Sequence, residues 1–255
     1  MQILYVTLIG LFAGLVSTSI GSILPTFLGR KAEKYISLML GIAAGVMVAL
    51  VFADLMPEAV HAGNLAYPKN NAGMLIAYAG FLAGALSMTL IDKMLPHRHF
   101  TMLEPHVNVK LYKTGLLTAL GIALHNLPEG LAIGAGYAHS NELGFTLFVA
   151  IALHNLPEGL ALGTPLAGCG ICRWKVLTIG AAAGLPMALG AFLGAAFGMI
   201  SPAMVSVSLG IAAGAMLYIV ADELIPESQK SAIGHSGTYG TVIGSLLGLL
   251  LIYFV

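Results

Sequence analysis

GIALHNLPEGLAIG at residues 121–134 is repeated almost unchanged as AIALHNLPEGLALG at residues 150–163. The two stretches agree at twelve of their fourteen aligned positions, and both carry a His, an Asn and a Glu within apolar sequence. Apolar residues continue on either side of each copy for the roughly 20 positions that an α-helix needs to cross a bilayer. The repeat therefore predicts two membrane helices with polar side chains at their centres.

The whole chain has the composition of an integral membrane protein. Of its 255 residues, 58% are hydrophobic and only 9% are charged, which excludes an ordinary soluble domain. No segment shows the alternation of apolar and polar residues that transmembrane strands require. We predict an all-α protein with one polytopic membrane domain, residues 1–255, and eight spans at about residues 3–24, 37–60, 74–95, 114–138, 144–166, 176–200, 203–226 and 238–255.

The basic residues predict the orientation of these spans. If the spans alternate, ten of the eleven lysines and arginines lie on one side of the membrane, and only Lys69 lies on the other. Because basic residues accumulate in cytoplasmic loops, both termini are predicted to face outside. The hydrophobic composition makes the lipid bilayer an expected partner. Because the 11 basic residues are balanced by 11 acidic ones, nucleic acid is not an expected partner.

A second repeat links two spans that cross the membrane in opposite directions. GIAAGVMVALVFADLMPEA (41–59) matches GIAAGAMLYIVADELIPES (210–228) at ten of nineteen positions, including both Pro-Glu pairs. These stretches lie in spans 2 and 7, and the HNLPEG copies lie in spans 4 and 5, so both similarities are predicted to be inverted repeats. Inverted repeats with a substrate site near the midplane are typical of secondary transporters.

The HNLPEG motifs place ionisable side chains near the middle of the membrane. In each motif the His and the Glu are four residues apart, so they share one face of a helix. Two glutamates at that depth are costly unless something compensates their charge. We interpret the motifs as a site for a divalent metal ion, with a His–Glu hydrogen-bond network without metal as the alternative. The candidate ligands are His125, Asn126, Glu129, His154, Asn155 and Glu158.

Proline and glycine within the motifs predict the shape of these helices. Pro128 and Pro157 have no N–H group, so each is expected to kink its helix at the site. Glycines at 130 and 134, and at 159 and 163, have the spacing that lets membrane helices approach closely. If spans 4 and 5 pack as an antiparallel pair, their ligands can meet in one cluster.

At these residues the chain resembles the ZIP family of divalent-metal transporters, and most closely its bacterial ZupT-type members. The likeness is carried by the doubled HNLPEG motif, the eight spans, MISPAMV (199–205) and DELIP (222–226), and it covers nearly the whole chain. It implies metal import across the plasma membrane of a prokaryote, with the six ligands above. It also implies a homodimer in which spans 1, 4, 5 and 6 bear the metal and spans 2, 3, 7 and 8 form a scaffold.

One residue departs from the pattern of that family. Similar proteins have a glutamate in span 6 that helps to hold a second metal, whereas this chain has Met187 there, within AGLPMALGA (183–191). Because a thioether carries no charge, we expect one tightly held ion at the midplane rather than two. Met187 itself is predicted to be a packing residue, with a ligand for soft metals as the alternative.

The donors narrow the choice of ion and suggest a route. A mixed imidazole and carboxylate site favours Zn²⁺, with Fe²⁺, Mn²⁺, Co²⁺ and Cd²⁺ as further substrates, and no organic cofactor is expected. Several residues nearer the membrane faces could relay the ion or could simply be solvated. They are Asp54 and Glu58 toward the outside, Asp222, Glu223 and Glu227 toward the inside, and His97, His99 and His106 in the connection between spans 3 and 4.

Three functions are compatible with these patterns. They are a metal importer, an intramembrane zinc metallohydrolase, and a metal-stabilised structural or sensory protein. The inverted repeats and the paired midplane ligands favour the importer. The hydrolase is less favoured because the chain lacks an HExxH motif and has no separate general base, so we predict that the protein is not an enzyme.

Overall fold

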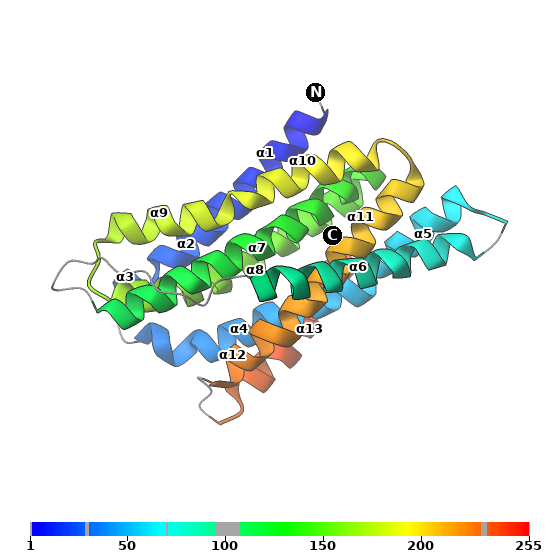
Figure 1. Ribbon diagram of the computed structural model, residues 1–255. Helices are drawn as coiled ribbons and strands as arrows, with labels where there is room; N and C mark the ends of the chain where they lie inside the picture. Colours follow the sequence, from blue (N-terminus) through cyan, green and yellow to red (C-terminus); the bar gives the residue numbers. More distant parts are fainter. Residues whose placement is uncertain (1, 29–30, 70, 95–107, 231–233, 255) are drawn as a thin grey trace.

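The computed structural model describes residues 2–28, 31–69, 71–94, 108–230 and 234–254, and within these residues every regular element is a helix. Eight of the helical stretches are long and apolar enough to cross a membrane, which confirms the predicted number of spans (Figure 1). They cover Gln2–Phe27, Tyr35–Ala66, Ala72–Leu90, Leu111–His139, Asn141–Gly168, Arg173–Gly198, Pro202–Lys230 and Ser236–Phe254. The second and seventh spans extend beyond their predicted ends.

Four spans are single α-helices and four are composed of shorter pieces. The single helices are α6 (Ala72–Met94), α7 (Val109–His139), α8 (Asn141–Gly168) and α13 (Ser236–Phe254). Span 6 consists of α9 (Arg173–Gly184) and α10 (Pro186–Gly198). Each of the remaining three spans contains a π-helical segment, η1 to η3. Span 1 consists of α1 (Gln2–Phe12), η1 (Ala13–Ser17), α2 (Thr18–Ile23) and α3 (Pro25–Leu28). Span 2 consists of α4 (Lys31–Leu50), η2 (Val51–Leu55) and α5 (Met56–Ala66), and span 7 of α11 (Pro202–Ile219), η3 (Val220–Leu224) and α12 (Ile225–Lys230).

The π-helical segments of spans 2 and 7 occupy matching positions of the second sequence repeat. In the ungapped alignment of 41–59 with 210–228, η2 falls on η3, and the first residue of α5 falls on the first residue of α12. A π-helical turn widens the helix and frees it from the regular bonding ladder, and such turns occur frequently at functional sites. Asp54 in η2 and Glu223 in η3 stand at equivalent places within them.

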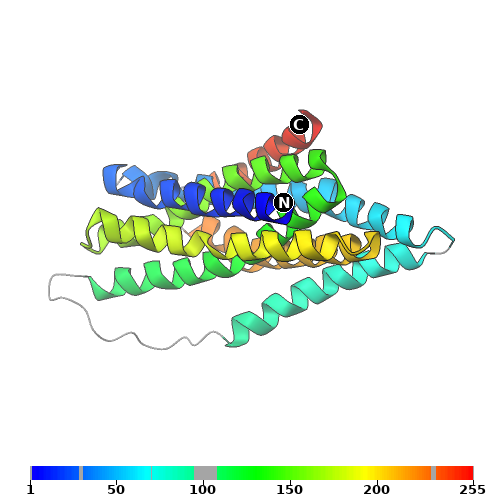
Figure 2. The same cartoon turned by 90° about the horizontal axis from the view of Figure 1, so that it is seen from above.

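The two HNLPEG helices form an antiparallel hairpin. Ser140 alone separates α7 from α8, and its N–H donates to the carbonyl of Gly136 at 2.8 Å while its hydroxyl accepts from the N–H of Leu143 at 3.1 Å. One residue therefore ends the first helix and caps the second. This sharp reversal packs α8 along α7. Figure 2 shows the green part of the chain turning back at the end of α7.

Small residues bring neighbouring helices into backbone contact around the hairpin. α7 packs along α10, and α8 packs along α2. A Cβ at Gly130 would overlap the carbonyl oxygen of Met187, and one at Gly163 would overlap the backbone of Ser22. The expected role of these glycines is confirmed. α7 and α8 both continue as α-helix through Pro128 and Pro157.

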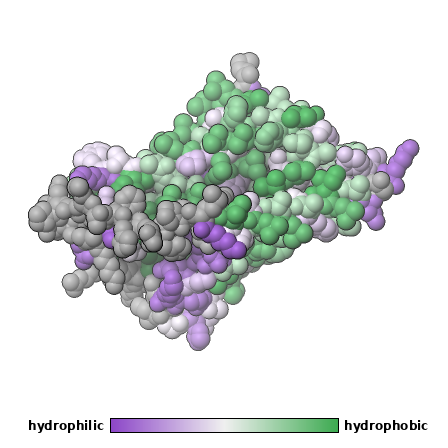
Figure 3. Space-filling model, in the orientation of Figure 1, coloured by the Kyte–Doolittle hydropathy of each residue, from purple (hydrophilic) through white to green (hydrophobic). Residues whose placement is uncertain are grey.

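The remaining spans complete the bundle and face the lipid. α4 packs along α13, α6 packs along α11, and contacts of α8 with α4 and of α7 with α11 connect the two groups. Apolar side chains cover the middle of the surface and polar ones gather toward its ends (Figure 3). Exposed leucines along α6 and α13, among them Leu82, Leu86 and Leu246, fit a lipid-facing surface.

Candidate metal site

Three ionisable side chains of the hairpin meet in the interior. Glu129 on α7 and His154 and Glu158 on α8 each offer a ligand atom, and these atoms lie within 4.8 Å of one another. The residues are 0, 2 and 1% exposed, respectively. The Nε2 atom of His154 lies 2.8 Å from Oε1 of Glu129. The antiparallel hairpin thus produces a compact group of one imidazole and two carboxylates, drawn from both copies of the motif.

The backbone orients both histidines in the same way. The Nδ1 atom of His154 lies 3.1 Å from the carbonyl oxygen of Ala150, and that of His125 lies 2.8 Å from the carbonyl oxygen of Gly121. A carbonyl accepts only, so each Nδ1 carries the proton and each Nε2 is left as the ligand atom. Metal-binding histidines are commonly fixed by such a bond from the second ring nitrogen.

Glu158 is buried without a partner. Neither of its carboxylate oxygens accepts a hydrogen bond from the described residues. A carboxylate in this position is removed from bulk water and receives no hydrogen bond from the protein in exchange, so its burial is energetically costly. A proton or a cation bound to this side chain would therefore be stabilising.

The two asparagines line the group and are connected to a third helix. Asn126 donates through Nδ2 to the carbonyl of Ala183 at 2.9 Å, and Asn155 Nδ2 lies 3.4 Å from Oδ1 of Asn126. If the amide of Asn155 is turned by half a rotation, its nitrogen instead donates to Oε2 of Glu129 and to the carbonyl of Ile151, both at 3.2 Å. In the unturned orientation the amide oxygen faces that carboxylate, an arrangement that a cation would stabilise.

His125 lies apart from this group, although it was predicted to be an equal member. Its Nε2 atom makes no hydrogen bond within the described part of the chain and lies 3.7 Å from Oε2 of Glu223 on span 7. His125 is nevertheless 1% exposed. The structure therefore places three of the four His and Glu residues together and turns the fourth toward the acids of η3.

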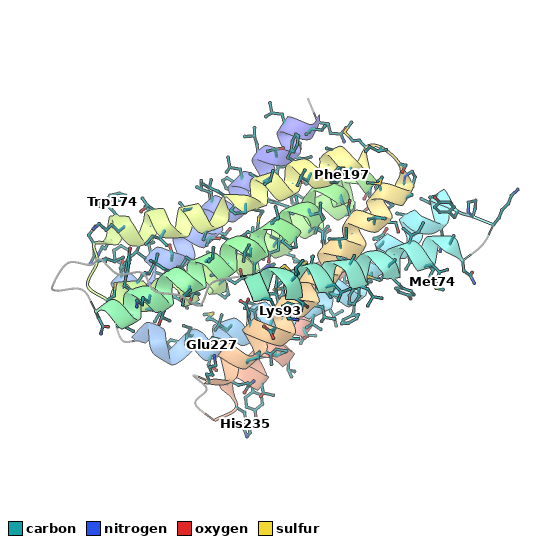
Figure 4. The ribbon with its side chains drawn as sticks, in the orientation of Figure 1. Met74, Lys93, Trp174, Phe197, Glu227 and His235 are labelled. Atoms are coloured by element: carbon teal, nitrogen blue, oxygen red, sulfur yellow. The ribbon has the colours of Figure 1, made fainter. Side chains whose placement is uncertain are left out.

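A cavity of about 480 Å³ connects His125 and Glu158 with these acids. It lies between the first half of α7, α8 and the end of span 7, on the side that the basic loops predict to be cytoplasmic. Its polar lining comes from both sides: His125, Glu158, Thr118, Asp222, Glu223, Glu227 and Lys230. Figure 4 shows Glu227 on α12, where it pairs with Lys230 at 2.7 Å. All three predicted inner acids thus line one space that reaches the site.

The predicted outer acids behave differently from each other. Asp54 is 9% exposed, and its Oδ2 atom has no hydrogen-bond partner among the described residues. Glu58, one turn further along, lies 3.1 Å from Nε2 of His139. No sequence pattern indicates His139, because a single histidine at a helix end is not distinctive. His97, His99 and His106 lie outside the described residues.

Met187 is fully buried beside the site. It lies at the start of α10, immediately after the interruption at Leu185, and its Sδ atom is 4.0 Å from Nδ2 of Asn155. Its main chain forms the surface against which Gly130 packs. A buried packing role fits these contacts, and its side chain still reaches the polar group.

Comparison with known proteins places this arrangement in a family. A family profile described as ZIP Zinc transporter matches residues 105–255. The chain is 34% identical over 245 residues to "Zinc transporter ZupT" of Chlorobium limicola, with 92% of this chain and 91% of the relative covered. It is 33% identical over 278 residues to the protein of the same name from Campylobacter jejuni, with 95% and 94% covered.

Proposed function

Because the chain belongs to the ZIP family of zinc transporters, we propose that it carries divalent metal ions, with Zn²⁺ as the main substrate, through the site between α7 and α8. The family also makes it a multi-pass protein of the bacterial plasma membrane and a transporter rather than an enzyme. We assign both the metal site and the transport route to particular residues.

The observation that carries the proposal is the carboxylate of Glu158. It is fully buried, it lacks any hydrogen bond from the described residues, and it lies within 4.8 Å of a second carboxylate and an imidazole. Two acids and one histidine with a single hydrogen bond among them are unfavourable in a membrane interior. One divalent cation would neutralise both acids and bind the Nε2 atom of His154 in place of its hydrogen bond to Glu129.

The donor set favours borderline metals. Zn²⁺ is bound by imidazole nitrogen and carboxylate oxygen at about 2.0–2.2 Å in tetrahedral sites. Glu129, His154 and Glu158 would supply three ligands, and an amide oxygen of Asn126 or Asn155 or a water the fourth. Fe²⁺, Mn²⁺, Co²⁺ and Cd²⁺ use the same donors, so we propose them as further substrates. The absence of thiolate from this set suits an ion that must be released.

The inner half of the route follows the cavity. Glu158 faces both the buried group and the cavity, and His125 lies between it and Glu223. An ion leaving the site would pass from Glu158 to His125 and then to the acids of η3 and α12. Asn126, Glu129, His154 and Asn155 do not line the cavity, so the cavity meets the buried group at Glu158.

The matched π-helical segments support inverted repeats as the basis of alternating access. Spans 2 and 7 share ten of nineteen residues and place Asp54 and Glu223 in equivalent widened turns. The end of span 7 faces the inner cavity, and we propose that the end of span 2 lines the outer route. The outside position of both termini remains a proposal from the distribution of basic residues. The division into two groups of four spans and the homodimer remain proposals from the family resemblance.

Reconstitution tests the proposal directly. Purified protein in vesicles that enclose a zinc-sensitive dye should produce a metal-dependent signal when Zn²⁺ is added outside. Vesicles that contain the Glu158→Gln protein should not, and a Glu142→Gln protein, altered at an exposed acid at the start of the same helix, should match the wild type. Tight binding without flux would instead favour a metal-stabilised structural or sensory protein.

A further inference from the structure

A second group of metal-binding side chains lies at the opposite end of α7 from the cavity. Glu58 and His61 stand three residues apart on α5, so they share one face of that helix. His139 is the last residue of α7, and its Nε2 atom lies 3.1 Å from Oε2 of Glu58. The rings of His61 and His139 lie 5.8 Å apart at an angle of 77°.

The spacing of the two rings suits a shared ion. Two imidazoles that bind one tetrahedral Zn²⁺ at about 2.0–2.1 Å have ring centroids about 5 Å apart. The observed separation is within a small side-chain movement of that value. A carboxylate oxygen already in contact with one imidazole supplies the third ligand, and two histidines with one carboxylate form a frequent zinc ligand set.

The side chains of this group are partly exposed at the surface of the protein. The side chains of His139 and Glu58 are 19 and 33% exposed, and His61 is exposed. A shallow open groove runs beside it along α5, lined by Pro57, Val60, His61, Asn64 and Leu65. α5 lies at the far end of the molecule from α12, which carries the inner acids (Figure 1).

We propose that Glu58, His61 and His139 form an outer capture site for a divalent transition-metal ion. The inference rests on the proposed transport function, because it gives the ion a first binding point before the midplane. Asp54 lies one helical turn deeper than Glu58 and has a buried oxygen without a hydrogen-bond partner among the described residues. The captured ion would pass from Glu58 to Asp54 and then toward the buried group.

An ion pair alone does not explain the arrangement. A Glu58–His139 pair needs a single protonated imidazole and makes no use of His61. The second ring stands edge to face with the first at a centroid distance of 5.8 Å, so a small side-chain movement would be needed to bring its nitrogen to the same ion. If both rings were protonated they would repel each other, whereas two neutral rings can share a metal ion.

Metal binding can be measured at this site in isolation from the midplane. The full-length protein carrying His154→Ala and Glu158→Gln, in lipid nanodiscs, lacks two of the three midplane ligands and retains the proposed outer site intact. Titration with Co²⁺ should produce visible absorption bands of a nitrogen-containing tetrahedral site with a stoichiometry of one. Adding His61→Ala or His139→Ala should weaken Co²⁺ binding at least about tenfold, because each removes a direct ligand. Adding His235→Ala, at an exposed loop histidine before α13, should change nothing.

Uptake by the otherwise unmodified protein separates the two proposals. His61→Asn and His139→Asn should raise the KM for Zn²⁺ while kcat at saturating metal stays near the wild-type value, since the midplane site is intact. Unchanged Co²⁺ affinity in both histidine variants would overturn the outer site while leaving transport standing. A Co²⁺ signal that depends on these histidines, in a protein that moves no zinc, would sink the transport proposal and leave the outer site.

Discussion

His154 and Glu129 approach each other to 2.8 Å across the hairpin, which places a proton between the ligand nitrogen and a carboxylate oxygen. The Nδ1 atom of His154 is already bonded to a main-chain carbonyl, so the shared proton must lie on the metal-binding side of the ring or on the carboxylate. Metal and proton therefore compete for the same atoms.

This competition predicts that metal affinity falls as the pH falls. Imidazole and carboxylate bind metal only in their deprotonated forms, so acidification from about pH 7.5 to about pH 5.5 should weaken Zn²⁺ binding at the midplane. Calorimetry of the His61→Ala/His139→Ala protein in buffers of different ionisation enthalpy would count the protons released per ion. Affinity that is independent of pH, with no proton release, would contradict the assignment of His154 as a ligand.

Glu158→Gln should abolish transport and stabilise the metal-free protein. The amide has nearly the same shape as the carboxylate but no charge, so it removes the cost of an unpartnered buried anion together with a metal ligand. We expect uptake to fall by at least about 100-fold. The melting temperature without metal should rise or stay equal, and the stabilisation by added Zn²⁺ should be lost. Glu142→Gln serves as the control, because that acid is exposed at the start of α8.

A Glu158→Gln protein with wild-type uptake would show that Glu158 is not a ligand.

His125→Ala is expected to reduce transport severely as well, yet through a different step. Since His125 faces the cavity and lies 3.7 Å from Glu223, its loss should slow release more than it weakens binding. Equilibrium binding and single-turnover release from the same preparation would separate these effects.

The inner acids should affect the rate more than the affinity. Glu223→Gln removes one of the three acids of span 7 that line the cavity, so the local attraction for a cation on its way out is weaker. We expect kcat for uptake to fall about tenfold with a midplane Kd close to that of the wild type. Glu142→Gln again provides a charge-matched control outside the cavity. An increase in Kd without any change in kcat would place Glu223 among the ligands instead.

Gly130→Ala should destabilise the hairpin by a packing conflict. The added methyl group would overlap the carbonyl oxygen of Met187, which is main chain and cannot rotate away. Overpacking of this kind costs about 1–3 kcal/mol, so thermal unfolding in detergent should occur at a clearly lower temperature. Gly168→Ala is the matched control, since its methyl group would meet only the flexible end of Leu111 at 3.3 Å. Equal stability of the two variants would mean that α7 and α10 can move apart at little cost.

The sequence was sufficient to predict the eight spans and the buried group of Glu129, His154 and Glu158, for physical reasons. Long apolar runs have one stable form in a bilayer, and a His and Glu four residues apart must share a helix face. The meeting of the ligands could be predicted only on the condition that spans 4 and 5 pack as an antiparallel pair. The one-residue turn at Ser140 then sets the depth at which α8 faces α7. Counted from Ser140, Glu129 lies eleven residues back and His154 fourteen forward, which fixes their pairing.

The remaining features depend on contacts between distant segments. His125 shares its motif with Glu129 but faces Glu223, and only the position of η3 decides this. His61, in the middle of α5, and His139, the last residue of α7, are 78 residues apart, so no local pattern connects them. The π-helical turns likewise leave no local signal, although their coincidence with the repeat of 41–59 and 210–228 could have been suspected from the paired acids.

The last prediction concerns Met187, whose thioether sulfur lies 4.0 Å from Nδ2 of Asn155 in a fully buried position. Two carboxylates already serve the site, and they can neutralise one divalent ion. Met187→Glu adds a third acid of similar length where no solvent reaches it, so without metal the variant should be less stable than the wild type. The surplus charge should recruit a second ion, which raises the number of tightly bound midplane ions from one toward two and restores stability. Anomalous diffraction at the zinc edge, or calorimetric titration in the His61→Ala/His139→Ala background, would count them. Met187→Gln, which has the same shape without the charge, should keep a count of one. Two tightly held midplane ions in the unmodified protein, or the same count in both variants, would show that residue 187 does not set the number of ions.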